Sequence, residues 1–415
     1  MCRHWMRRAA LAAGIFFLIG SARADIAPPL DTVPFVEIDS PAAAGSQSPS
    51  LVAGKKAVYL TWIETTSGGN PVLKLSRNAG SGWSTPQTVL SDPRMVVNGA
   101  DVPKFLALDN GTLVVAWLHG QEDAAEAYDV EVIASDDDGA TWHSLGKPHG
   151  DKAQVEHGFV SLLPHAGDGF WIAWLDGRNH AKASHSPGVG QHGANTELRV
   201  ARWRDGHFEP EVRLDDRVCD CCQTAAVVTL EGLAVAYRDR GPKETRDISL
   251  VRYERKAWSK PIPIRNDNWT IDGCPVNGPA MAGKDQNLAL AWYTEANETP
   301  QVFVALSDSS SFGLSRIVKV DDGRPMGRVD VDWLADQSAL VTWVEQTGDG
   351  TADVRIKRVT VDGTASVSKT LAQIGTGMSS GFPQLAVRDI GIWVAWTDAA
   401  AKKVRLGHFD LMSTD

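Results

Sequence analysis

The chain has 415 residues, of which 43% are hydrophobic and 22% charged, and its formal net charge at pH 7 is -10. A surface of this sign repels phosphate backbones and anionic lipid, which argues against nucleic acid as a partner. The chain is longer than the domains that usually fold around a single hydrophobic core, so we expect either two domains or a repeat architecture.

The N-terminal segment is typical of a secretory signal peptide. Three arginines precede an apolar run at 9–19, and small residues occupy positions 22 and 24. The run is too short to span a bilayer, and no later stretch approaches the ~20 apolar residues that a membrane helix needs. We therefore expect a signal peptide at 1–24, one domain at 25–415, a periplasmic or secreted location and no membrane span. Without the signal, 37 basic residues face 51 acidic ones and the net charge becomes -14.

Seven short runs then share one pattern, a string of apolar residues that ends in an aromatic residue and a polar or charged one. The runs are 57–64, 113–120, 170–177, 233–240, 288–295, 339–346 and 392–399. Their aromatic residues are Trp62, Trp117, Trp174, Tyr237, Trp292, Trp343 and Trp396, which lie 51 to 63 residues apart. Runs of this length that are apolar on both faces predict strands buried on both faces. Such a period suits a blade of four strands.

The other strands of each blade can be placed around these runs. We expect first strands such as 105–108 and 225–230, and third strands such as 130–135 and 249–253. The last unit has no room for a fourth strand, which residues 33–39 could supply by pairing the two ends of the chain. The predicted fold is therefore an all-β propeller of four-stranded blades, with seven blades preferred and six as the alternative.

A turn after the third strand of the second unit has a distinctive spacing. Ser135, Asp137, Gly139, Thr141 and Trp142 follow the pattern Ser-x-Asp-x-Gly-x-Thr-Trp. The aspartate is expected to cap backbone amides of the turn, the glycine to take a positive φ, and the tryptophan to pack under the hairpin. A second copy is Ser76, Asn78, Gly80 and Trp83, and degenerate copies lie at 203–208, 253–258 and 307–314.

These turns, in register with the strand repeat, resemble the Asp-box (BNR) repeats of the sialidase superfamily over most of the chain. The resemblance implies a box on the face opposite the active site. It also implies a glycosidase site in which arginines hold an acidic sugar, an Asp serves as acid/base, and a Glu activates a Tyr nucleophile. The matching candidates here are Arg178, Arg238, Arg240 and Arg328 for the sugar, Asp101 as acid/base and Glu295 as helper.

The chain departs from the sialidase pattern in several respects. It has no Arg-Ile-Pro after the signal, no Tyr in its last blades, and seven units where the family has six blades. A sialidase-type glycoside hydrolase or an inactive glycan-binding propeller is therefore the alternative function, and the sequence leaves open whether the protein is an enzyme.

Cysteines are the most unusual feature. Cys219, Cys221 and Cys222 directly precede the first strand of the fourth unit, and Cys274 precedes that of the fifth. In a propeller the first strands surround the central channel, so all four thiols should meet at its mouth. Two disulfides are one interpretation, because the count is even and an exported protein meets oxidising conditions. Adjacent Cys221 and Cys222 cannot easily pair with each other, and several thiolates also suit one copper or zinc ion, with His157 as a further ligand.

Thiol-disulfide redox chemistry can accompany either interpretation. Asp101, His157 and Arg328 occupy equivalent positions before the first strands of their units, and Met378 lies nearby in the seventh unit. The long loop at 176–197 is expected to form a flap over the same face. It contains Arg178, His180, His185 and His192. The histidines read as surface or hydrogen-bonded residues without a role are His119, His143, His149, His165, His207 and His408.

The sequence thus predicts an exported propeller with a thiolate-rich site at the channel mouth that binds copper or zinc. An acidic glycan is the alternative ligand, and another exported protein is a third possible partner.

Overall fold

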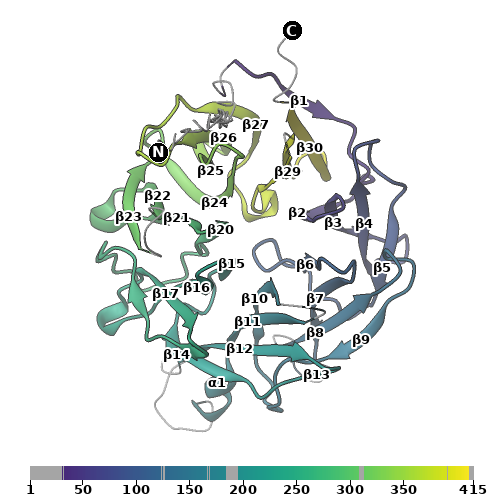
Figure 1. Cartoon of the computed structure of the whole chain (residues 1–415). Helices are drawn as coiled ribbons and strands as arrows, with labels where there is room; N and C mark the ends of the chain where they lie inside the picture. Colours follow the sequence, from purple (N-terminus) through teal and green to yellow (C-terminus); the bar gives the residue numbers. More distant parts are fainter. Residues whose placement is uncertain are drawn as a thin grey trace, which may run out of the picture.

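The computed structural model describes residues 30, 32–122, 124, 127–165, 167, 169–183, 195–307, 313–389 and 391–410. The predicted signal peptide at 1–24 lies outside these residues. Within them the chain forms seven antiparallel sheets arranged as a ring, with the first strand of each sheet toward the centre (Figure 1). The fold is a seven-bladed β-propeller, as the repeat predicted, and the six-bladed alternative is excluded. No helix in the described ranges is long and apolar enough to cross a membrane.

The first three blades follow the chain in order. Blade 1 contains β2 (Gln47–Ala53), β3 (Val58–Thr65), β4 (Pro71–Asn78) and β5 (Gln87–Ser91). Blade 2 contains β6 (Lys104–Ala107), β7 (Leu113–Gly120), β8 (Tyr128–Ser135) and β9 (His143–Gly146). Blade 3 contains β10 (His157–Pro164), β11 (Phe170–Asp176), β12 (Thr196–Arg204), β13 (His207–Phe208) and β14 (Val212–Val218). In blade 3 the outer edge is divided, because β13 and β14 both pair with β12.

Blades 4 to 6 repeat this order. Blade 4 contains β15 (Ala225–Thr229), β16 (Gly232–Arg238), β17 (Ile248–Glu254), β18 (Ala257–Trp258) and β19 (Ile262–Pro263). Blade 5 contains β20 (Ala280–Lys284), β21 (Asn287–Thr294), β22 (Gln301–Ser307) and β23 (Leu314–Lys319). Blade 6 contains β24 (Pro325–Trp333), β25 (Ala339–Gly348), β26 (Thr351–Val359) and β27 (Lys369–Gly375). Short helices are α1 (Arg178–Ala183), η2 (Pro242–Glu244), η3 (Ala296–Glu298) and η4 (Met378–Ser380).

Blade 7 joins the two ends of the chain. It contains β28 (Gln384–Arg388), β29 (Gly391–Asp398), β30 (Lys403–Asp410) and the N-terminal β1 (Phe35–Ile38). β1 pairs antiparallel with β30, with Phe35 opposite Phe409. This confirms the predicted ring closure, in which the N-terminal strand completes the last blade as its outer strand.

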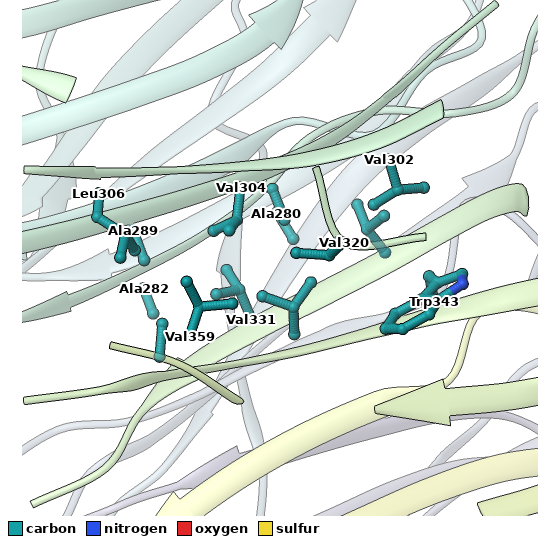
Figure 2. Packing of buried hydrophobic residues seen from close by; sticks show 14 of the residues in the cluster. Ala280, Ala282, Ala289, Val302, Val304, Leu306, Val320, Val331, Trp343 and Val359 are labelled. Carbon is teal, nitrogen blue, oxygen red and sulfur yellow. The ribbon is translucent and has the colours of Figure 1, made fainter. Parts of the chain in front are cut away.

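The predicted apolar runs form the second strand of every blade. One hydrophobic cluster fills each of the seven contacts between neighbouring blades. Figure 2 shows part of the cluster between blades 5 and 6, where Val304 and Leu306 face Val331 and Val359. Burial on both faces explains why these strands lack the alternation of apolar and polar residues that half-exposed strands have.

The polar residue that follows several aromatic anchors has a structural role. The indole Nε1 of Trp62 donates to Glu64 at 2.7 Å, that of Trp174 to Asp176 at 2.8 Å, and that of Trp343 to Glu345 at 2.7 Å. A buried indole N–H requires an acceptor, and a carboxylate two residues on lies on the same face of the strand. In these three blades the repeat therefore supplies both a core residue and its hydrogen-bond partner.

The turn between β8 and β9 adopts the local structure expected from its spacing. Asp137 accepts hydrogen bonds from the Thr141 amide at 2.8 Å and its hydroxyl at 2.6 Å, and Ser135 accepts one from the Gly139 amide at 2.9 Å. Gly139 has φ +87°. Because this turn follows a third strand, it lies on the face opposite the loops that lead into the first strands.

The first strands of all seven blades surround a central channel of about 780 Å³. Lys104 and Lys284 line it together with Asp330 and Asp332. The loops that lead into the first strands (lead-in loops) surround one mouth of this channel. That mouth is where the candidate site residues were expected.

Candidate functional site

The lead-in loops of blades 4 and 5 hold the cysteines next to each other. Cys219, Cys221 and Cys222 have their sulfur atoms within 4.8 Å of one another. Gln223, which follows them, donates to the Ala100 carbonyl at 2.9 Å and accepts from the Gly278 amide at 2.9 Å. This side chain joins the lead-in loops of blades 2, 4 and 5. The expectation that the thiols meet at the channel mouth is therefore met.

The four sulfurs are not equivalent. Cys221 and Cys274 form a disulfide that joins blades 4 and 5. Cys219 and Cys222 are free and each is only 1% exposed. Their sulfur atoms lie 2.7 Å apart, and the sulfur of Cys219 lies 3.7 Å from that of Cys221. The prediction of four thiolate ligands needs correction for this state of the protein, because a disulfide sulfur carries no thiolate charge.

The surroundings of Cys219 favour its ionised form. Burial opposes ionisation, but the Cys222 thiol, the Cys221 amide and the charges of Arg238 and Arg246 together lower the pKa of Cys219 to about 7. Burial and the neighbouring Cys219 raise the pKa of Cys222. The pair therefore holds one proton tightly and one loosely, which is the arrangement that reactive cysteine pairs require. Arg246 was not identified from the sequence, in which it is one of many arginines near strand ends.

Two of the predicted arginines hold the mouth together. Arg238 donates to the carbonyl oxygens of Asn277 at 2.8 Å and Tyr293 at 2.7 Å, and it also donates to that of Arg246. Arg328 donates to those of Thr376 at 2.8 Å and Gly377 at 3.1 Å. Both side chains are buried. Arg238 joins the end of β16 to the lead-in loop of blade 5, and Arg328 joins β24 to the lead-in loop of blade 7.

The other two arginines are paired with carboxylates. Arg178 contacts Asp176 at 2.6 Å and Glu211 at 2.8 Å. Arg240 contacts Glu244 at 2.8 Å. The four arginines predicted to bind an acidic sugar thus each bond to a different set of protein groups.

The predicted acid/base and its helper lie in different blades. Asp101 is 2% exposed and accepts the Phe159 amide at 2.7 Å. Its burial raises its pKa to about 7. Glu295 follows β21 in blade 5 and is exposed. Beside it, burial and the charge of Glu295 raise the pKa of Tyr293. Asp101 therefore has a raised pKa that suits a general acid or base near neutral pH.

His157 does not join the cysteines. Its ring nitrogens face Asp129, Asp151 and Asp176 at 3.1 to 3.8 Å. Its ring stacks on that of His149, with centroids 4.0 Å apart and an interplanar angle of 2°. His149, interpreted from the sequence as a surface or hydrogen-bonded residue, has a side chain that is only 1% exposed, and its Nδ1 lies 3.4 Å from Asp151 Oδ2.

The predicted flap at 176–197 is described in part. It begins with α1, and His180 contacts the Thr196 hydroxyl at 3.0 Å. His185 and His192 lie outside the described residues, as does any closure over the channel mouth. Met378 lies at the mouth, where its sulfur is 3.5 Å from a guanidinium nitrogen of Arg328.

Comparison with known proteins places the fold. No family model matches the chain, and no curated protein matches it. Among solved structures it is similar to a PL25 ulvan lyase bound to -[GlcA(1-4)Rha3S]-, with 10% identity, 89% of this chain and 95% of that chain covered, and a TM-score of 0.53. It is also similar to the Hadza microbial sialidase Hz136, with 14% identity, 82% and 73% covered, and a TM-score of 0.50.

A GH93 α-L-arabinofuranosidase of Fusarium graminearum matches with 17% identity over 77% of this chain and 94% of that chain, at a TM-score of 0.47. The chain is a sialidase-like β-propeller. At these identities the likeness is one of fold.

Proposed function

We propose that this protein is a thiol-disulfide redox protein whose active groups are the four cysteines at the channel mouth. The observation that carries the proposal is the free Cys219 sulfur, which lies 3.7 Å from a sulfur of the Cys221–Cys274 disulfide and 2.7 Å from that of Cys222. Cys219 and Cys222 have Cys-x-x-Cys spacing, which is common in redox pairs because one thiol is readily ionised and the other completes the exchange.

The exchange is balanced within the cluster. The Cys219 thiolate attacks the sulfur of Cys221, a bond forms between them, and Cys274 leaves as a thiolate. Cys222, after losing its proton, then attacks Cys219 and releases Cys221. The buried pair becomes the disulfide, and the two electrons now reside on the thiols of Cys221 and Cys274. Cys274 is exposed, so this second pair can reduce a disulfide of another exported protein.

Oxidised glutathione is a suitable probe for this exchange. The protein with Cys219 and Cys222 reduced and the Cys221–Cys274 disulfide intact should reduce it at a rate that increases with pH around the Cys219 pKa of about 7. The variant Cys219→Ser should lose at least ~90% of this rate, whereas His143→Ala, an exposed histidine of blade 2, should keep it. Equal rates for Cys219→Ser and the unchanged chain would exclude the proposal.

Binding of copper or zinc is the second candidate. The two free thiols of Cys219 and Cys222, whose sulfur atoms are 2.7 Å apart, favour it, since thiolates select soft and borderline metal ions. One Cu⁺ between two thiolates would carry a single negative charge, which Arg238 and Arg246 could offset. Metal–sulfur bonds of about 2.3 Å would require Cys219 and Cys222 to move apart from their present 2.7 Å. Metal analysis of protein purified under reducing conditions tests this, and less than about a tenth of an equivalent would exclude it.

An acidic glycan is the third candidate, supported by the fold shared with a sialidase and an ulvan lyase. The geometry favours it less, because each candidate arginine already bonds to protein carboxylates or carbonyls. Release of a fluorophore from a sialoside, with loss of that release in Asp101→Asn, would support this function over the redox one.

A further inference from the structure

A buried cluster of histidine and aspartate lies between blades 2 and 3, apart from the cysteines. Asp129 is on β8 in blade 2, His149 is on the loop after β9, and His157 is the first residue of β10 in blade 3. All three residues are buried, and one ligand atom from each lies within 4.8 Å of the others. Nitrogen and oxygen atoms of this kind are the usual ligands of zinc and similar ions.

The three ligand atoms converge on one side of the stacked imidazoles. Asp129 Oδ1 is 3.6 Å from His149 Nε2 and 3.7 Å from His157 Nδ1. The Gln121 amide also donates to this oxygen at 2.9 Å, and Lys147 Nζ contacts the other carboxylate oxygen at 2.6 Å. Both contacts fix the carboxylate and leave one lone-pair direction of Oδ1 toward the histidines.

Asp151 lies on the opposite side of the rings. Its Oδ2 is 3.4 Å from His149 Nδ1 and 3.1 Å from His157 Nε2. Histidines that bind metals usually direct their second ring nitrogen to a carboxylate, which fixes the tautomer and leaves the first nitrogen unprotonated. Asp151 can do this for both rings at once. The remaining nitrogens, His149 Nε2 and His157 Nδ1, are the ones that face Asp129.

His149 provides the second observation. Its side chain is 1% exposed, and its Nε2, which faces Asp129, has no hydrogen-bond partner. Leaving a buried polar atom without a partner costs ~1–3 kcal/mol. A bound ion would supply the missing partner. His157 Nδ1 hydrogen-bonds to the Tyr128 carbonyl oxygen at 3.3 Å. An ion bound at Nδ1 would take the place of this proton, and the carbonyl oxygen would then be free to serve as a fourth ligand.

Arg178 argues for this side of the rings over the other. His157, Asp151 and Asp176 form a second close group, but the Arg178 guanidinium already lies 3.2 Å from Asp151 and 2.6 Å from Asp176. A fixed positive charge there opposes a second cation. On the side that faces Asp129, the Lys147 ammonium contacts Oδ2 of the carboxylate, whereas the ring nitrogens face Oδ1.

We propose that Asp129, His149 and His157 form a binding site for one divalent transition-metal ion of the zinc type. The site joins a strand of blade 2 to the first strand of blade 3. With three protein side chains and one carbonyl, all buried, it has the closed character of a structural zinc site. The proposal is independent of the redox proposal, because none of the four cysteines takes part.

The test uses the full chain with Cys219→Ser and Cys222→Ser, which removes the two free thiols as competing ligands. After treatment with a chelator, this protein should take up about one equivalent of Zn²⁺ or Co²⁺. Bound Co²⁺ should give a visible spectrum without a thiolate charge-transfer band, and Zn²⁺ should raise the melting temperature because it binds only the folded state.

The variants His149→Ala and Asp129→Asn should each lower the Zn²⁺ affinity by about 100-fold. Asp151→Asn should lower it by about 10- to 100-fold, because the ligands remain but lose their orienting carboxylate. The exposed His143→Ala is the matched control and should bind normally. Uptake below a tenth of an equivalent would overturn the proposal, as would normal uptake by both His149→Ala and Asp129→Asn. If those variants do not fold, the Co²⁺ spectrum of the Cys219→Ser/Cys222→Ser protein tests the proposal instead. A thiolate charge-transfer band in that spectrum would also overturn the proposal, because it would show that sulfur binds the ion.

Discussion

The guanidinium of Arg246 is buried beside Cys219, and its positive charge helps to hold the pKa of that thiol at about 7. The other partner of Arg246 is Glu244, at 2.8 Å. A buried arginine next to a thiol favours the thiolate over the thiol. This relationship makes the cysteine pair responsive to pH in the neutral range.

Removal of that charge should raise the pKa of Cys219. In Arg246→Met the thiolate loses one of its two nearby cations, so its ionisation should shift upward by ~1 pH unit. Arg246→Lys keeps the charge and should shift it less. The ultraviolet absorbance of the thiolate, measured from pH 5 to 10 with Cys219→Ser as the blank, reports the midpoint. An unchanged midpoint in Arg246→Met would show that the Cys222 thiol and the Cys221 amide alone lower the pKa.

The Cys221–Cys274 disulfide should contribute to stability. It closes a loop with a sequence separation of 53 residues between blades 4 and 5. A cross-link of this length restricts the unfolded chain, and its loss typically costs ~2–4 kcal/mol. We expect Cys274→Ser to lower the free energy of unfolding in urea by this amount. The double variant Cys219→Ser/Cys222→Ser contains the disulfide and should lose less. If both variants lost the same free energy of unfolding, the loss would come from disturbed local packing and not from removal of the cross-link.

Much of the fold could be predicted from the sequence because the clearest signal, the burial of each second strand, is contained in a short stretch of consecutive residues. Each second strand is buried on both faces, so its run of apolar residues and its aromatic anchor appear directly in the chain. The need to close the ring predicted the pairing of residues 33–39 with the last blade, which the contact between Phe35 and Phe409 confirms.

The position of the cysteine site at the channel mouth could be predicted from the sequence, but the pairing of its sulfur atoms could not. The lead-in loops of blades 4 and 5 had to meet, yet four cysteines allow three pairings, and only their positions in space select Cys221 with Cys274. Arg238 illustrates the same limit, because the carbonyl oxygens that it bonds belong to three separate segments. His149 and His157 are eight residues apart, but their stacking depends on the path of the loop between them.

The channel contains a pH-dependent contact between blades 6 and 7. Asp332 accepts the Trp333 amide and the Val387 amide, each at 2.7 Å. Burial raises its pKa from 3.8 to about 6. The folded protein therefore binds this proton more tightly than the unfolded chain does. The resulting stabilisation is complete below pH 3.8 and is lost as the pH rises through about 6.

Asp332→Asn should accordingly reduce the difference in unfolding free energy between pH 4.5 and pH 7.5. Asp332→Ala removes both acceptors and should cost ~1–3 kcal/mol, since two amides lose their partner. Urea denaturation at the two pH values measures both effects. Asp389→Asn, an exposed aspartate that also lines the channel, is the control and should leave the difference unchanged.

Ring closure depends on a close approach between Phe35 and Gly407. A Cβ atom at Gly407 would lie 2.2 Å from the Phe35 ring, which itself packs against Phe409 with centroids 4.9 Å apart. Gly407→Ala should therefore displace β1 from β30 and lower the free energy of unfolding by ~1–3 kcal/mol. Phe35→Leu removes part of the ring and should cost less.

The double variant distinguishes this clash from a general intolerance of alanine in β30. If the Phe35 ring causes the strain, Gly407→Ala should be nearly neutral when Phe35→Leu is already present, and the two effects should be non-additive by more than 0.5 kcal/mol. Additive losses would mean that the ring can move aside and that the glycine is required for another reason. Because β1 supplies the outer strand of blade 7, Gly407→Ala should also increase proteolysis near the N-terminus, whereas Phe35→Leu/Gly407→Ala should restore resistance.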